Sequence, residues 1–281
     1  MERGRAARSL VGLALGFWTL SLVQAQAGPT WDRGDASFVE TLGEGPEGQD
    51  KDRPVWPLRA RLSGPTARYD HDILGGIPHW TRLTVAATAC GSCPGGSAVQ
   101  SFVLPETMVF EDVAPRLWDV TGDGRPEVVV VETALDRGAR LAVWGFGEID
   151  IFTRLATTAY IGAPHRWLAP IGAADLDGDG RIELVYVDRP HLAKELVVVR
   201  LEGGRLREVA RAPGFSAHRI GDTGITGALR DCGDGRAEVL LPNGDWSRLL
   251  AVRLVSGRIV ARDLGTLSKG ALHRASAEGC E

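Results

Sequence analysis

The stretch DLDGDGRIELVYVD, residues 175–188, places four carboxylates within nine positions and then continues as an apolar, β-branched run. The carboxylates would repel one another unless a hard cation lay between them. A solvated turn is the alternative, since Asp and Gly are common turn residues. The four carboxylates are Asp175, Asp177, Asp179 and Glu183, and Gly178 and Gly180 lie in two of the gaps between them.

This stretch belongs to a repeat. DVTGDGRPEVVVVE, residues 119–132, lies 56 positions earlier and aligns with it without a gap. A third copy, RDCGDGRAEVLLP, follows about 55 positions later at residues 230–242, where Arg230 and Cys232 replace the first two ligand-type residues. Self-similarity at a fixed period indicates a modular array.

The segments between the acidic loops have the pattern of strands and turns. Each loop is followed by three β-rich runs and preceded by a fourth, with turn signals such as EGGR and VSGR between them. No sustained helical periodicity occurs outside the N-terminal segment. Four antiparallel strands per repeat, stacked radially, describe a propeller blade. The sequence therefore predicts an all-β fold, a β-propeller of four-stranded blades of about 55 residues, with about four to five blades.

We expect the propeller domain to cover residues 67–281. Residues 68–110 have the pattern of an earlier, divergent blade without an acidic loop. The tail, residues 270–281, is too short for a blade and could supply a closing strand to the first one. Residues 28–66 are rich in Gly, Pro, Asp and Glu, which predicts an extended or partly disordered lead-in.

The N-terminus has the pattern of a signal peptide. Three arginines precede the apolar run 10–23, and AQA at residues 25–27 predicts cleavage after Ala27. An uncleaved N-terminal anchor is the alternative. No later segment is long enough to span a bilayer, so we expect a secreted or periplasmic protein.

The charge balance narrows the choice of partners. The chain carries a net charge of −4, which argues against nucleic acid or an anionic membrane surface as a partner. The six histidines show no metal-ligand spacing, and each is expected to be an ordinary surface or packing residue.

The four cysteines form an even set, which points to disulfides in an exported chain. Cys90 and Cys93 are formally a CxxC motif, typical elsewhere of a redox pair or half a zinc site. Since no second CxxC accompanies them, we expect a small structural disulfide. Elimination then leaves Cys232 and Cys280 as the second pair.

The acidic loops have the spacing of calcium sites. Calcium takes roughly six to eight oxygen ligands, and positions 1, 3, 5, 7 (by its carbonyl) and 9 of a tight loop can converge on one ion. An EF-hand is excluded, because position 12 is Tyr186 or Val130 where a bidentate Glu is needed. The first site has one charge fewer, so we expect it to bind more weakly. The predicted Ca²⁺ ligands are Asp119, Thr121, Asp123, Arg125 and Glu127 in the first copy, and Asp175, Asp177, Asp179, Arg181 and Glu183 in the second.

These loops resemble the FG-GAP/VCBS repeats of integrin-α-type propellers. Residues 175–187 fit the family pattern throughout, and residues 119–131 fit it with Thr121 in place of the second acid. The resemblance implies a calcium-stabilised scaffold that presents loops for binding. The third copy departs from the pattern, and one hypothesis is that the Arg230 guanidinium takes the cation's place and pairs with Asp234 and Glu238.

No enzyme motif is visible, neither GxSxG, HExxH nor a P-loop. The predicted function is a non-catalytic binding or structural module of the cell envelope, with a protein or glycan partner. Tryptophans such as Trp80, Trp144 and Trp167 could form sugar platforms, although packing between blades is the expected role. The alternative is a propeller enzyme, a hydrolase or lyase on carbohydrate or phosphate ester, whose residues are scattered in loops. Carboxylates or histidines clustered outside the calcium loops would favour the enzyme.

Overall fold

The computed structural model describes residues 38–42, 57–87, 99–147 and 151–280. These residues form antiparallel β-sheets and one short helix, which confirms the all-β fold class. Residues 1–27, with the predicted signal peptide, and the pair Cys90 and Cys93 lie outside the described residues. No helix among the described residues is long and apolar enough to cross a membrane.

Two sheets repeat the same four-stranded meander, in which each strand pairs with the next along the chain. Every strand overlaps a run that the sequence predicted, because β-branched residues alternate with short turns there. One sheet consists of β10 (Leu168–Ala174), β11 (Glu183–Asp188), β12 (Glu195–Glu202) and β13 (Arg205–Pro213), and the other of β14 (Ala228–Asp231), β15 (Ala237–Pro242), β16 (Arg248–Val255) and β17 (Arg258–Thr266).

The remaining strands form one nine-stranded sheet, which contains the first copy of the repeat. Strands β6 to β9 have the same meander order as the two later sheets, and β5 joins them to the N-terminal strands by pairing with β7. The strands are β1 (Phe38–Leu42), β2 (Pro57–Thr66), β3 (His79–Ala87), β4 (Val99–Val103), β5 (Met108–Phe110), β6 (Arg116–Trp118), β7 (Glu127–Ala134), β8 (Gly138–Phe146) and β9 (Phe152–Thr157).

The N-terminal strands change the expected extent of the ordered part. β1 and β2 both fall in residues 28–66, the predicted lead-in, and β2 pairs with β3 from Pro57 to Thr66. Ala60 and Leu62 of β2 are fully buried. The sheet therefore begins before residue 67. The Gly- and Pro-rich composition of this region did not predict β2, because pairing with β3 stabilises that strand.

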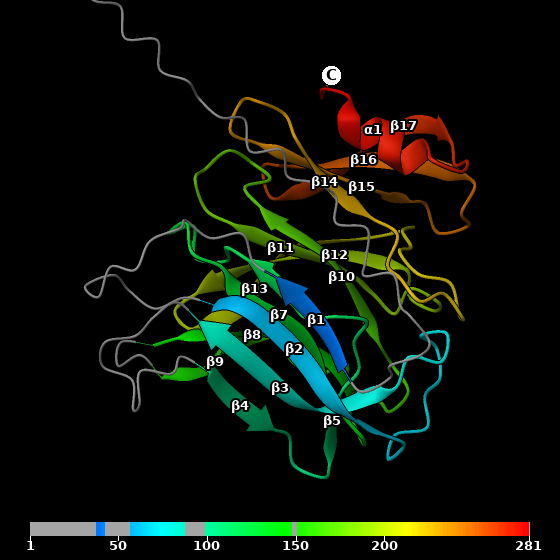
Figure 1. The fold of residues 1–281 in the computed structure, drawn as a ribbon. Coiled ribbons are helices and arrows are strands. Elements are labelled where there is room, and N and C mark those ends of the chain that lie inside the picture. The colour runs from blue at the N-terminus through cyan, green and yellow to red at the C-terminus, as the bar shows by residue number, and fades with distance from the viewer. Residues whose placement is uncertain (1–37, 43–56, 88–98, 148–150, 281) are drawn as a thin grey trace, which may run out of the picture.

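The sheets follow one another in chain order and are packed face to face (Figure 1). All residues of β7, β11 and β15 are buried, because each of these central strands is covered on both faces. Successive sheets approach closely where β10 meets β14: a Cβ on Gly172 would lie 2.5 Å from Leu229. One large apolar core extends through the sheets.

The C-terminal tail does not supply a closing strand. It forms the helix α1 (Ala271–Ala277), which lies against the β14–β17 sheet (Figure 1). Ala275 packs there against Leu240, Leu249 and Ala251. A closing strand was expected because a closed ring of propeller blades can be completed by a strand from the C-terminus. Its Ala- and Leu-containing sequence instead covers an apolar sheet face with about two turns of amphipathic helix.

Candidate metal centre

The first acidic loop, residues 119–127, connects β6 to β7 and is held by one of its own carboxylates. Asp119 accepts hydrogen bonds from the amides of Gly122 and Gly124, both at 2.8 Å. Asp123 pairs with the guanidinium of Arg125. Both glycines have positive φ, which lets the backbone turn back on Asp119.

Glu127 closes the first loop from the start of β7 and is only 8% exposed. Its carboxylate accepts the amides of Val120 at 2.8 Å and Thr121 at 3.3 Å, and the Thr121 hydroxyl at 3.4 Å. Burial raises the pKa of Glu127 to about 7; the two amides oppose this rise, and the charges of Asp119 and Asp123 add to it. Among the described residues, no cationic side chain compensates this carboxylate.

The second acidic loop, residues 175–183, repeats the same backbone arrangement between β10 and β11. Asp175 accepts the amides of Gly178 at 2.6 Å and Gly180 at 2.8 Å, as Asp119 does in the first loop. Asp175, Asp177 and Glu183 bring carboxylate oxygens within 4.8 Å of one another, close enough to share a metal ion.

A guanidinium nevertheless lies among the carboxylates of the second loop. Arg200 of β12 is 6% exposed and stands opposite Glu183 in the strand register. It donates from Nε to Glu183 at 2.5 Å, and its terminal nitrogens lie 3.2 Å from Asp179 and 3.4 Å from Asp177. Burial still raises the pKa of Glu183, although the hydrogen bond from Arg200 lowers it. Arg200 thus supplies positive charge where a cation was predicted.

The corresponding position in the first copy is a glycine. Val128 pairs with Trp144, so Glu127 stands across from Gly145. A Cβ there would lie 3.1 Å from Glu127 and 2.6 Å from Leu155, which leaves no room for a longer side chain without movement of Leu155. The sequence shows this difference: the position is Gly145 within WGF in the first copy, and Arg200 and Arg253 within the VRL segments of the second and third copies.

In the third copy, an arginine side chain lies against the closing glutamate. Arg230 of β14 pairs with the buried Glu238, as the sequence hypothesis required. The predicted pairing of Arg230 with Asp234 was wrong, because Asp234 pairs with Arg236, two residues away. Arg253, in the position equivalent to Arg200, also donates to Glu238 at 2.5 Å.

A second group of titratable side chains lies at the opposite ends of the strands. We call Tyr69, His71, His79, Glu111 and His165 the histidine cluster; they come from the β2–β3, β5–β6 and β9–β10 connections and from the start of β3. The Tyr69 ring centroid lies 5.7, 5.4 and 5.2 Å from those of His71, His79 and His165. Sequence spacing predicted no relation among these histidines, because they are far apart along the chain and only the fold brings them together.

Glu111 is the buried centre of the histidine cluster. One carboxylate oxygen lies 2.5 Å from Nδ1 of His71 and 3.8 Å from Nε2 of His79. The other accepts the Thr133 hydroxyl at 2.7 Å. A buried carboxylate on Nδ1 orients the imidazole and leaves its Nε2 for proton transfer.

Two further histidines lie beside this cluster. Trp167 connects them, since its indole NH donates to the Glu111 carbonyl at 2.8 Å and its ring contacts His218. His218 donates from Nε2 to the Asp222 carbonyl, so its Nδ1 can accept from His191 at 3.0 Å. Burial lowers the pKa of His191 to about 4 and also lowers that of His218, so both are neutral at pH 7.

The tryptophans and one disulfide follow the sequence prediction. Trp80, Trp144 and Trp167 are at most 5% exposed, which confirms packing as their role. Cys232 and Cys280 form a disulfide, as elimination predicted.

One comparison with known proteins, the family model, agrees with the loop geometry. Residues 119–186 match the family model of the FG-GAP-like repeat. No curated protein matches the chain. Among solved structures, a Lactobacillus plantarum protein aligns with 67% of this chain and 54% of its own length, at 10% identity and a TM-score of 0.35, so the match spans about half of that protein. Residues 119–186, which contain both complete acidic loops, are therefore an FG-GAP-like repeat segment.

Proposed function

We propose that this protein is an exported, calcium-stabilised, non-catalytic scaffold whose four-stranded units are blades of a small propeller-like array. The observation that carries the calcium proposal is Glu127, a buried carboxylate with no cation against it among the described residues. Calcium supplies such compensation and prefers the oxygen donors gathered there. Asp119, Thr121, Asp123, the Arg125 carbonyl and Glu127 would hold the ion.

The second loop has the better sequence but a competing cation. Calcium there must displace Arg200, whose guanidinium already contacts Asp177, Asp179 and Glu183. A displaced guanidinium would leave a buried charge without its partners, which is costly. We therefore infer that the first loop binds calcium more tightly, the reverse of the order expected from charge alone.

The experiment is a calcium titration of the chain by isothermal calorimetry. Wild type should show one site of higher affinity, which Asp119→Asn removes and Asp175→Asn leaves in place. Loss of the tight site in Asp175→Asn alone would contradict the order proposed. Absence of any calcium binding in wild type would overturn the calcium proposal itself.

Export and a binding role rest on other features. The Cys232–Cys280 disulfide is typical of oxidising compartments, as the predicted signal peptide requires. The strand ends opposite the acidic loops carry long connections, such as residues 214–227 between β13 and β14, which suit recognition of a protein or glycan.

The histidine cluster favours a second candidate function, that of an enzyme with a loop site. His71, oriented by Glu111, would act as the general base or acid on a carbohydrate or phosphate ester. Assays against nitrophenyl glycosides and nitrophenyl phosphate would test it. Turnover abolished by His71→Ala and Glu111→Gln, but kept by Asp119→Asn, would support the enzyme, whereas no turnover of either substrate class by wild type would count against it.

A further inference from the structure

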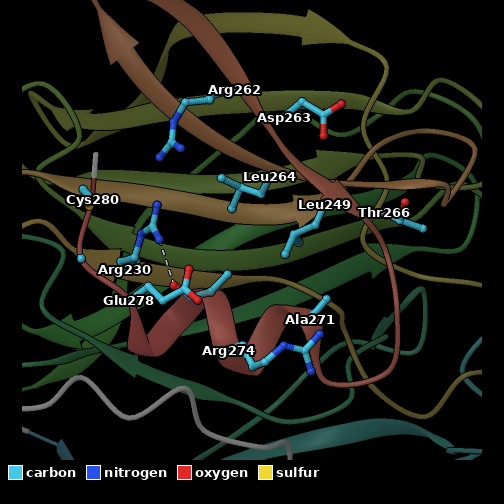
Figure 2. A pocket seen from close by; sticks show the side chains of 12 residues that line it. Arg230, Leu249, Arg262, Asp263, Leu264, Thr266, Ala271, Arg274, Glu278 and Cys280 are labelled. Carbon is cyan, nitrogen blue, oxygen red and sulfur yellow. Dashed lines mark hydrogen bonds between the residues drawn. The ribbon is translucent and has the colours of Figure 1, made fainter.

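A pocket of about 660 Å³ lies between α1 and the β14–β17 sheet. Its volume is in the range of small-molecule sites, roughly 300–1,000 Å³. Arg230 and Arg262 approach from the sheet, Arg274 comes from α1, and the apolar side chains of Leu249 and Leu264 lie between them (Figure 2). The wall at the end of α1 includes Cys280, which the disulfide fixes to Cys232.

Arg230 is the deeply buried cation of this pocket, with 3% of its surface exposed. Its terminal nitrogens donate to the Ala275 carbonyl at 3.0 Å and to Glu238. Its Nε is buried and has no hydrogen-bond partner. The Glu238 carboxylate is also contacted by Arg253 and Arg262. A buried guanidinium with an unsatisfied donor is costly unless a further acceptor approaches it.

Arg274 extends the positive lining along α1. Its contacts are with neutral acceptors, the Lys269 carbonyl at 3.5 Å and the Ser268 hydroxyl at 3.3 Å. Two acidic residues are in the lining. Asp263 is paired with Arg248 at 2.8 Å, and Glu278 is the other, a negative charge that would repel a bound anion.

We propose that this pocket binds a small organic anion, whose carboxylate or other oxyanion group lies against Arg230 and Arg262 and whose apolar body lies on Leu249 and Leu264. Guanidinium groups recognise oxyanions through charge-assisted hydrogen bonds, and Leu249 and Leu264 offer the apolar contact by which an organic anion would differ from an inorganic one. The pocket contains Arg230 of the third repeat but no residue of the two loops that we propose bind calcium, so it does not depend on calcium.

The test is calorimetric titration in EDTA and at constant ionic strength with sodium benzoate, sodium sulfate and sodium phosphate, against a sodium chloride reference. We expect saturable binding at one site per chain, tightest for benzoate. Tighter binding of sulfate or phosphate than of benzoate would overturn the organic-anion assignment, and saturable binding of none of the three would overturn the pocket as an oxyanion site.

Substitutions of the lining residues test where in the pocket the anion binds. Arg262→Gln should weaken benzoate binding about tenfold, the value of one charge-assisted hydrogen bond, and Glu278→Gln should strengthen it by removing repulsion. The matched control is Arg258→Gln, at the exposed start of the same strand β17, which should leave affinity unchanged. Should Arg262→Gln fail to fold, Arg274→Gln on the exposed side of α1 serves in its place. Equal affinity in the pocket variants and the control would overturn the proposal.

Discussion

The first and second acidic loops share a backbone and differ in what neutralises their carboxylates. In both, an aspartate at the loop start binds two glycine amides, and a buried glutamate closes the loop from the next strand. The strand across from that glutamate carries Arg200 in the second copy and Gly145 in the first. One residue outside the motif therefore decides whether the loop contains its own cation or, as we propose for the first loop, takes one from solution.

The largest effect should come from Arg200→Met, measured by urea unfolding in EDTA. Removing one partner of a buried ion pair leaves uncompensated charge, so we expect a loss of about 3–5 kcal/mol in the free energy of unfolding. Calcium should restore much of this loss, because the vacated second loop then resembles the first. Arg207→Met, on the more exposed β13, is the control and should cost little. A small loss in both variants would show that Arg200 does not neutralise the loop.

The next effect is calcium stabilisation through the first loop. At about a hundredfold excess over the dissociation constant, calcium should add roughly 2.7 kcal/mol to the free energy of unfolding. Glu127→Gln should abolish this gain, whereas Glu106→Gln, an exposed acid, should keep it. A gain that survives Glu127→Gln would assign calcium to another loop.

The pH dependence of stability in EDTA should distinguish the loops further. The pKa of Glu127 is raised from 4.5 to about 7 in the folded chain, so between these values the folded state holds a proton that the unfolded state has released. Stability should therefore fall as pH rises from about 5 to 7, by at most about 3 kcal/mol. Glu127→Gln should flatten this slope, and so should saturating calcium. A slope unchanged in Glu127→Gln would point to another group.

The smallest effect concerns the backbone that the loops share. Gly122 and Gly178 occupy equivalent positions with φ of 76° and 82°, so alanine at either should cost about 1 kcal/mol. Gly178→Ala should cost slightly more, because its Cβ would lie 2.9 Å from Arg236, against 3.4 Å from Ile182 for Gly122. Gly147→Ala, without positive φ or a close neighbour, is the control. Sensitivity in only one loop would contradict the common geometry.

Several features of the fold follow from local sequence. The apolar runs after the acidic loops became β7, β11 and β15, since β-branched residues between Gly-rich turns form strands wherever sheets can cover them. The strand β2 and the helix α1 were not predicted, because a strand in Gly- and Pro-rich sequence and a short helix on a sheet face depend on tertiary partners.

The candidate sites divide in the same way. Spacing within nine residues was enough to place Asp119, Glu127, Asp175 and Glu183 in common loops, because those residues are neighbours along the chain. Only the strand register placed Arg200 among the carboxylates of its loop, and only the meeting of separate connections assembled His71 and Glu111. Sequence determines which groups a loop offers, whereas the strand register decides whether a distant guanidinium such as that of Arg200 lies among them.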